Sequence, residues 1–330
     1  MKVSILVPVY GVEKDIRRCA ESLMAQTYED IEYVFVDDCT PDRSIDILKE
    51  VVAEHPERKE QVRIIHHEKN GGSSAARCTA LDAATGDFIV WIDADDWVDL
   101  RMVELLVKKQ EETDADIVFS SFINHKANHD EKVIKQFAGT AQELSAAIVR
   151  LDFLWNMWGS LQRLSLYRDH NIRPETGANM GEDYQVMPQI TYYAQKVAFV
   201  PEYLTYYNQA NEGSFGRKGF HEHVYLQSRR SNQIVYDFCK GKGATMEQAA
   251  AIGQLRSAAS SLLTMARGQA PRKYYEQNHD IVRHSDHRLW RYIGLANRIA
   301  MHLGNYWLVS AFSLLQPVKR LLFPAHPYRK

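Results

Sequence analysis

The first third of the chain alternates between two hydrophobic periodicities. Short, continuous apolar runs predict buried strands at residues 3–9, 31–36, 62–65, 88–92 and 116–120. Between them, apolar residues return every three or four positions, which predicts helices over residues 12–23, 45–52, 73–85 and 100–109. Strands without polar alternation are buried on both faces. The pattern therefore predicts an α/β fold, in which helices cover both faces of a mostly parallel sheet.

The rest of the chain is less regular. Residues 139–170 look helical, residues 197–207 predict a strand, and the pattern is helical from about residue 222 onward. Gly86 lies where the C-terminal cap of the helix over 73–85 is expected. We therefore expect a helical C-terminal appendage after the α/β domain.

Composition and charge narrow the class of protein. The 330 residues include 40 Lys and Arg against 42 Asp and Glu, so no overall basic field exists that would hold nucleic acid. The four cysteines lack metal-binding or redox spacing and are expected to be reduced, buried thiols of a cytoplasmic protein. The N-terminal apolar run is too short for a signal peptide, and no apolar run is long enough to span a membrane.

The strongest chemical signal is an acidic cluster after the strand 88–92. Asp93 and Asp95 are two residues apart and can project to one side, and Asp96 and Asp99 follow closely. Crowded carboxylates of this kind suit Mg²⁺ or Mn²⁺, held together with substrate phosphates. The alternative is a solvated loop in which Asp99 caps the next helix.

Two further segments follow strands of the sheet, where ligands of such folds bind. Asp38 could bind a ribose or a base, or could serve only the local turn. Asn70 and Gly71 lead into a helix that carries Arg77, and such a helix start favours anions. Its spacing is neither a dinucleotide-binding fingerprint nor a P-loop, which argues against an NAD enzyme and a P-loop kinase. The alternative is an ordinary loop.

The second half of the chain offers one more acidic pair and several aromatic residues. Glu182 and Asp183 are adjacent, and one such carboxylate away from a metal can act as a general base. A solvated surface pair is the alternative. Four aromatic residues could stack on sugar rings, although packing in the core is expected for at least half of them: Trp155, Trp158, Tyr206 and Tyr207.

Together, and in order, these segments resemble the family 2 glycosyltransferases, whose nucleotide-sugar-binding fold is called GT-A. The matching segments are 4–10, 36–42, 70–77 and 86–97, with a fainter match over 158–163, 181–183 and 206–214. The resemblance implies transfer of a sugar from a nucleoside-diphosphate sugar, by default a UDP-sugar, to an acceptor hydroxyl with inversion. It also implies a place in the synthesis of bacterial cell-surface polysaccharide or glycolipid.

The resemblance assigns roles residue by residue. Donor binding would fall to Pro8, Tyr10, Asp38, Asn70, Gly71, Arg77 and Asp93. Asp95, with Asp93, would bind the Mn²⁺ or Mg²⁺ ion, and Asp183 would be the general base. Trp158 and Glu182 would lie on the side of the acceptor, a saccharide or a lipid-linked molecule.

The chain also departs from the family pattern. Gly11 stands where Asn is usual, Cys78 and Ala80 replace Asn and Gly, and Ser160 stands where the family has Lys. The loss of that Lys affects the acceptor side and not the donor side. Two alternative functions stay open: a sugar nucleotidyltransferase on a related fold, and a non-catalytic protein that binds nucleotide sugars.

We expect a GT-A domain over 1–222, with a nucleotide-sugar half (1–120) and an acceptor half (121–222), followed by a helical region over 223–330. Residues 283–330 carry eight basic residues and one acid, interleaved with aromatic and aliphatic residues. This mixture suits peripheral contact with the inner face of the cell membrane. The alternative is a helical appendage packed on the catalytic domain or on another subunit of a homo-oligomer.

Overall fold

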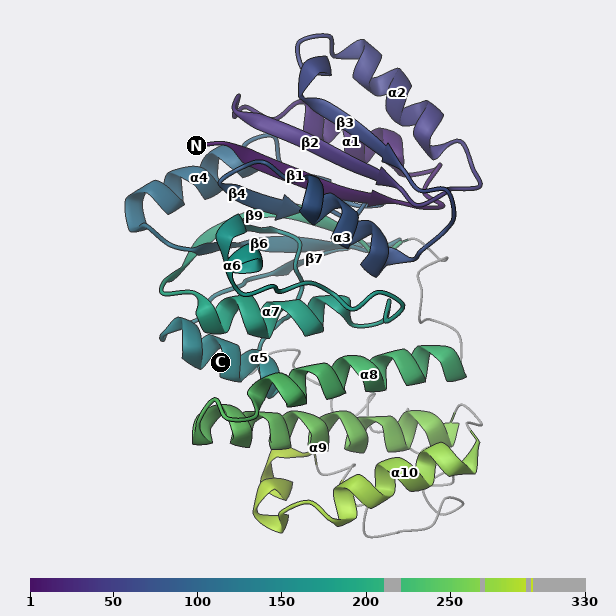
Figure 1. The fold of residues 1–330 in the computed structure, drawn as a ribbon, viewed down its shortest axis with the longest axis vertical. Coiled ribbons are helices and arrows are strands. Elements are labelled where there is room, and N and C mark those ends of the chain that lie inside the picture. The colour runs from purple at the N-terminus through teal and green to yellow at the C-terminus, as the bar shows by residue number, and fades with distance from the viewer. Residues whose placement is uncertain (211–220, 268–270, 295–297, 299–330) are drawn as a thin grey trace.

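The computed structural model describes residues 1–210, 221–267, 271–294 and 298 (Figure 1). Its described part contains one sheet, in which strands are ordered β3-β2-β1-β4-β8-β6-β9-β5 and β7 pairs with β6. The strands are β1 (Val3–Val9), β2 (Ile31–Asp37), β3 (Val62–His66), β4 (Phe88–Trp91), β5 (Trp97–Val98), β6 (Ile117–His125), β7 (Asp130–Val133), β8 (Ser160–Arg163) and β9 (Val197–Asn208).

The long strands of the sheet run in parallel. β1 lies between β2 and β4 in parallel register, β2 pairs in parallel with β3, and β6 pairs in parallel with β9. The antiparallel pairs involve the short strands β5, β7 and β8. The predicted mostly parallel α/β fold is therefore confirmed, and the carboxyl ends of β1, β2 and β4 meet at one edge of the sheet.

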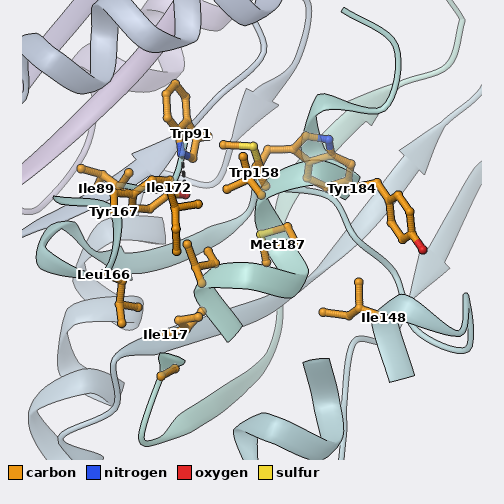
Figure 2. Close-up of a cluster of buried hydrophobic side chains, with 14 of the residues drawn as sticks. Ile89, Trp91, Ile117, Ile148, Trp158, Leu166, Tyr167, Ile172, Tyr184 and Met187 are labelled. Atoms are coloured by element: carbon orange, nitrogen blue, oxygen red, sulfur yellow. Dashed lines mark hydrogen bonds between the residues drawn. The ribbon is translucent and has the colours of Figure 1, made fainter. Parts of the chain in front are cut away.

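Helices cover both faces of the sheet. One face packs against α1 (Ile16–Met24), α2 (Ser44–Glu54) and α4 (Met102–Thr113), and the other against α3 (Ser73–Ala83), α5 (Ala141–Val149), α6 (Leu164–Asp169) and α7 (Glu182–Tyr193). Figure 2 shows part of the core between the sheet and the second group of helices, where Trp91 Nε1 donates a hydrogen bond to Tyr167 Oη at 3.2 Å. Burial of these apolar side chains from water stabilises the fold and fixes the helices against the sheet.

In the described residues after the α/β domain, three helices lie beyond α7 (Figure 1). They are α8 (Glu222–Cys239), α9 (Ala244–Arg267) and α10 (Arg272–Arg283), followed by a 3₁₀ turn over His287–Tyr292. Gly253 of α9 packs so closely on α5 that a Cβ atom there would lie 2.2 Å from the carbonyl oxygen of Val149. The helical C-terminal region is thus confirmed for the described residues. No helix among them combines the length and apolarity needed to cross a membrane.

Some expectations from the sequence are wrong. Residues 160–163 are not helical but form β8, which inserts between β4 and β6. Its polar residues Ser160 and Gln162 are buried and bonded internally: Gln162 Nε2 donates to the Met157 carbonyl at 2.7 Å and to Ser160 Oγ at 2.7 Å. A strand of this kind shows no apolar run, because its buried polar groups find partners inside the protein.

Two smaller corrections concern a glycine and a cysteine. α3 ends at Ala83, before Gly86. A Cβ atom on Gly86 would lie 2.7 Å from Ser4 Oγ, so the glycine allows close packing against β1 and does not cap the helix. All four cysteines are free thiols, but Cys39 is exposed and Cys78 is only partly buried, because both lie outside the cores.

The proposed domain boundaries stay predictions, and most of the basic segment 283–330 lies outside the described residues.

Candidate active site

The residues that the sequence singles out in the first third gather at the carboxyl ends of the parallel strands. Pro8 lies on β1 opposite Val36 of β2, and Tyr10 follows β1 with 52% of its surface exposed. Asp38 follows β2, and Asp93 follows β4 by one residue. The sheet thus supplies both a buried carboxylate and exposed groups along one edge. The donor-binding roles of Pro8 and Tyr10 stay predictions.

Asp38 organises the loop that precedes α3. Its carboxylate accepts hydrogen bonds from the backbone N–H groups of Gly71, at 2.8 Å, and Gly72, at 2.7 Å. His67 Nδ1 lies 2.7 Å from Oδ1 of the same carboxylate, and Asn70 Nδ2 donates to the Asp38 carbonyl at 3.3 Å. The carboxylate is buried, so these bonds fix the loop and the start of α3. Contact of Asp38 with a base or ribose stays a prediction.

A residue from the second half of the chain caps the same helix. Asn179 Oδ1 accepts a hydrogen bond from the backbone N–H of Ser74 at 3.1 Å, which satisfies a free donor at the start of α3. Gly72 adopts a φ of +85°, and a Cβ atom there would lie 2.1 Å from Asn179 Nδ2. The loop before α3 is therefore held in part by Asn179. No motif in the sequence indicates this role.

Arg77 lies at the centre of a carboxylate cluster. Its Nη2 donates to Asp93 Oδ1 at 2.7 Å, its Nε is 3.7 Å from Glu182 Oε1, and its Nη2 is 3.8 Å from Asp183 Oδ1. Burial opposes the guanidinium charge, but these three carboxylates raise the pKa of Arg77 above its ordinary value. The structure thus brings Glu182 and Asp183 together with Asp93, as a common catalytic site requires.

Within the described residues, Nε and Nη1 of Arg77 have no hydrogen-bond acceptor. Both nitrogens are themselves buried from solvent. Contact of Arg77 with a donor molecule stays a prediction.

Asp183 occupies the first turn of α7. Its Oδ2 accepts a hydrogen bond from the backbone N–H of Met157 at 3.1 Å, and its side chain is 17% exposed. Burial raises the pKa of Asp183 to about 7; Arg77 opposes this shift, whereas Glu182 and Asp93 add to it. Burial likewise raises the pKa of Glu182. A carboxylate with a pKa near neutrality is matched to the task of removing a proton from a hydroxyl group.

The acidic turn after β4 has the donor chemistry of a divalent-cation site. Asp93 and Asp95 offer carboxylate oxygens, and Asp96 Oδ2 is buried without a hydrogen-bond partner in the described structure. Burial, followed by the charges of Asp95 and Asp93, raises the pKa of Asp96. A hard cation would relieve this repulsion, so the residues fit Mg²⁺ or Mn²⁺.

The protein alone does not complete such a site. Across the described ranges, no three His, Cys, Asp or Glu side chains are grouped so that they could hold a metal ion. Two carboxylates would therefore need ligands from elsewhere, and a diphosphate would supply oxygens of the right kind. Metal binding by Asp93 and Asp95 stays a prediction.

The aromatic residues of the second half divide into buried and exposed groups. Trp158 is 7% exposed and stacks on Tyr207 with ring centroids 5.1 Å apart, within the core shown in Figure 2. Tyr206 stacks on Trp97 at 5.2 Å. Trp155, in contrast, is 39% exposed. Core packing is confirmed for Trp158, and its contact with an acceptor stays a prediction.

Known proteins that are similar to this chain are glycosyltransferases. The model of the family described as Glycosyl transferase family 2 matches residues 4–184. The chain is similar to the uncharacterized glycosyltransferase EpsJ of Bacillus subtilis, with 32% identity over 63% of this chain and 61% of EpsJ. It is also similar to the poly(ribitol-phosphate) beta-glucosyltransferase of Bacillus spizizenii, with 30% identity over 64% of this chain and 33% of that enzyme. Each alignment therefore spans less than two thirds of the relative.

The fold is similar to that of S. aureus TarS residues 1–349, solved in complex with UDP-GlcNAc. The TM-score is 0.71 at 18% identity, and the match covers 97% of this chain and 92% of that one. At this identity the likeness shows the fold alone. The family match extends over more than half of the chain and includes every residue of the carboxylate cluster around Arg77. The chain therefore belongs to glycosyl transferase family 2.

Proposed function

We propose that this glycosyltransferase moves a sugar from a UDP-sugar to an acceptor hydroxyl and inverts the configuration of the anomeric carbon. One observation carries the proposal: α7 brings Asp183, with a pKa raised to about 7, to the guanidinium that binds Asp93. Asp183, the proposed base for the acceptor, and Asp93, the proposed carboxylate on the donor side, thus share Arg77 as a partner. This arrangement supports a single displacement, in which the acceptor attacks the donor between Asp183 and Asp93.

The protein's own groups account for the proton. Asp183 takes the proton from the acceptor hydroxyl while the oxygen of that hydroxyl forms a bond to the anomeric carbon. The bond between the anomeric carbon and the nucleoside diphosphate breaks in the same step. The Met157 N–H holds the carboxylate in place. A divalent cation held by Asp93 and Asp95 would act as a Lewis acid and neutralise the charge of the leaving diphosphate. General base catalysis of this kind contributes about 10²–10⁴-fold.

The proposed substrates rest on the relatives. TarS, whose fold is shared, was solved with UDP-GlcNAc, and the relative from Bacillus spizizenii is named for glucosyl transfer to poly(ribitol phosphate). These observations support a UDP-sugar donor and a saccharide or lipid-linked acceptor of the bacterial cell surface. The test is release of UDP from UDP-glucose, UDP-galactose and UDP-N-acetylglucosamine, with and without oligosaccharide acceptors.

The two alternative functions give different results in this test. A non-catalytic binding protein would bind a nucleotide sugar and release no UDP. A nucleotidyltransferase would form the nucleotide sugar from a sugar phosphate and a nucleoside triphosphate, and would release pyrophosphate. Acceptor-dependent UDP release is the result that supports the proposal.

We also propose that the C-terminal region brings the enzyme to the cytoplasmic face of a membrane. The support is the excess of basic residues over 283–330, since each Lys or Arg near an anionic surface contributes about 1 kcal/mol. The full chain should therefore sediment with vesicles of phosphatidylglycerol at low salt and not with vesicles of phosphatidylcholine. Equal behaviour toward both vesicles would favour the packed-appendage alternative.

A further inference from the structure

A buried lysine close to Asp183 is not part of the site described so far. Lys135 lies in the segment between β7 and α5 and is 2% exposed. Its ammonium donates to Asn156 Oδ1 at 3.2 Å and lies 4.5 Å from the ring centroid of Phe119. Among the described residues, no carboxylate oxygen lies within 4.0 Å of the ammonium nitrogen. A buried charge with so few partners is costly, so its position calls for a reason.

The hydrogen bonds of Lys135 lead directly to the general base. Asn156 Nδ2 donates to the carbonyl of Trp158 at 2.8 Å, so the lysine and the asparagine together brace the turn 156–158. The middle residue of this turn, Met157, donates its N–H to Asp183 Oδ2. Backbone atoms of Lys135 are fixed as well, because its N–H donates to Ser121 Oγ at 3.1 Å. Lys135 is therefore bonded to Asn156, the neighbour in sequence of Met157, whose N–H holds the carboxylate of Asp183.

The charges of Lys135 and Asp183 also interact. Burial lowers the pKa of Lys135 to about 7, and the negative charge of Asp183 acts in the opposite direction. Such an interaction is reciprocal, so the ammonium must also favour the ionised form of Asp183.

We propose that Lys135 is a positioning residue for Asp183: through Asn156 it braces the turn 156–158, whose Met157 N–H holds the carboxylate, and its positive charge favours the ionised form of the base. The inference rests on the proposed function of Asp183. No bond is made or broken at Lys135 itself.

Several other titratable groups face Asp183 and must be considered with Lys135. Arg77 approaches from α3, Glu182 from α7 itself, Asp93 from the end of β4 and Tyr167 from α6. The ammonium of Lys135 faces Asp183, the amide of Asn156 and the rings of Phe119 and Phe153. A substitution at Lys135 therefore changes one charge and leaves the contacts of Arg77 intact.

The experiment compares Lys135→Met with Lys132→Met, which removes an exposed lysine three residues away. The reaction measured is UDP release from the UDP-sugar that the wild type uses, across pH 6 to 9. The positive charge of Lys135 favours the ionised form of Asp183, so Lys135→Met should lower kcat at pH 7. The loss should shrink toward pH 9, where Asp183 is ionised in both proteins, and the donor KM should stay unchanged. Lys135→Arg should retain more activity than Lys135→Met at pH 7.

A loss that is equal at every pH, or no loss at all, would overturn the proposal. If Lys135→Met does not fold, carbon-13 NMR of the carboxyl and lysine side chains decides the question without turnover. The pKa of Lys135 should then fall in Asp183→Asn, and an unchanged value would refute the interaction. If the proposed function of Asp183 is itself wrong, Asp183→Asn will keep normal turnover. This result distinguishes that failure from a failure of the Lys135 proposal.

Discussion

The Nη2 atom of Arg77 lies 3.8 Å from the Oδ1 atom of Asp183, although the two residues belong to opposite halves of the family domain. The same nitrogen donates to Asp93 Oδ1 at 2.7 Å. One buried guanidinium therefore links the acidic turn after β4 to the start of α7. Substitutions at the two ends of this link, in the acidic turn and at the start of α7, test the donor side and the acceptor side in turn.

Asp183→Asn tests the acceptor side. The amide cannot take a proton from the acceptor, so kcat should fall by about 10²-fold or more while the Kd for the donor stays nearly constant. Stopped assays of UDP release and isothermal titration with UDP measure the two quantities. Asp169→Asn, an exposed change on α6, is the matched control and should leave both unchanged. Normal turnover in Asp183→Asn, or loss of its donor binding, would contradict the assignment.

Asp95→Asn tests the donor side. Loss of one carboxylate from the acidic turn should abolish the part of UDP affinity that depends on Mn²⁺ or Mg²⁺, since two carboxylates are needed beside the diphosphate. UDP titrations with metal and with EDTA measure this part. Asp99→Asn is the control, because its carboxylate instead accepts the backbone N–H of Arg101 at 2.9 Å. Full wild-type activity in EDTA would show that the acidic turn does not work through a metal.

Gly72→Ala tests the contact between the loop and Asn179. The alanine would add strain at a φ of +85° and place its Cβ 2.1 Å from Asn179 Nδ2, so both stability and donor affinity should fall. Gly177→Ala is the matched control: its φ is +88°, but nothing lies within 4 Å of the added Cβ. The control should lose about 1–2 kcal/mol of unfolding free energy in urea, and Gly72→Ala clearly more. Equal losses in both variants would mean that the Asn179 contact is unimportant.

Glu32 gives the fold a defined pH dependence. Burial would raise its pKa, but hydrogen bonds from Ser4, Thr85 and Lys2 lower the pKa of Glu32 to about 2. Because the folded pKa is below the ordinary value, its stabilisation is complete above about pH 4.5 and is lost as the pH falls toward 2. The full effect is about 3 kcal/mol. Urea unfolding between pH 7 and pH 3 measures the greater part of it.

Two variants separate Glu32 from the other carboxylates. Glu32→Gln should be less stable than the wild type at pH 7 and should lose less stability on acidification. Glu60→Gln, an exposed change, should keep the wild-type pH dependence. If both variants follow the wild-type curve, Glu32 is not the group responsible.

The sequence predicts the parallel part of the fold well, because its strands are continuous apolar runs and its helices carry apolar stripes. It fails where burial involves polar groups. β8 is hidden because Ser160 and Gln162 find partners inside the protein. Glu32 also lies within an apolar run, and its charge is compensated only by residues that the fold brings near.

The candidate site is predicted in its parts and not in its connections. Asp93, Asp95 and Asp183 lie in recognisable motifs that each follow a strand or begin a helix. Asn179 and Lys135, in contrast, lie in segments without a motif. Their importance comes from contacts across the fold, with Gly72 and with the turn that holds Asp183, and these contacts depend on the three-dimensional packing.

The central claim is a single displacement with inversion, and the anomeric form of the first product tests it most directly. With water as acceptor, the enzyme should hydrolyse the UDP-α-sugar that it uses, and proton NMR at early times reads the configuration before mutarotation. The account predicts that the β-anomer appears first, together with UDP, and that Asp183→Asn suppresses both. An α-anomer as the first product would contradict the account.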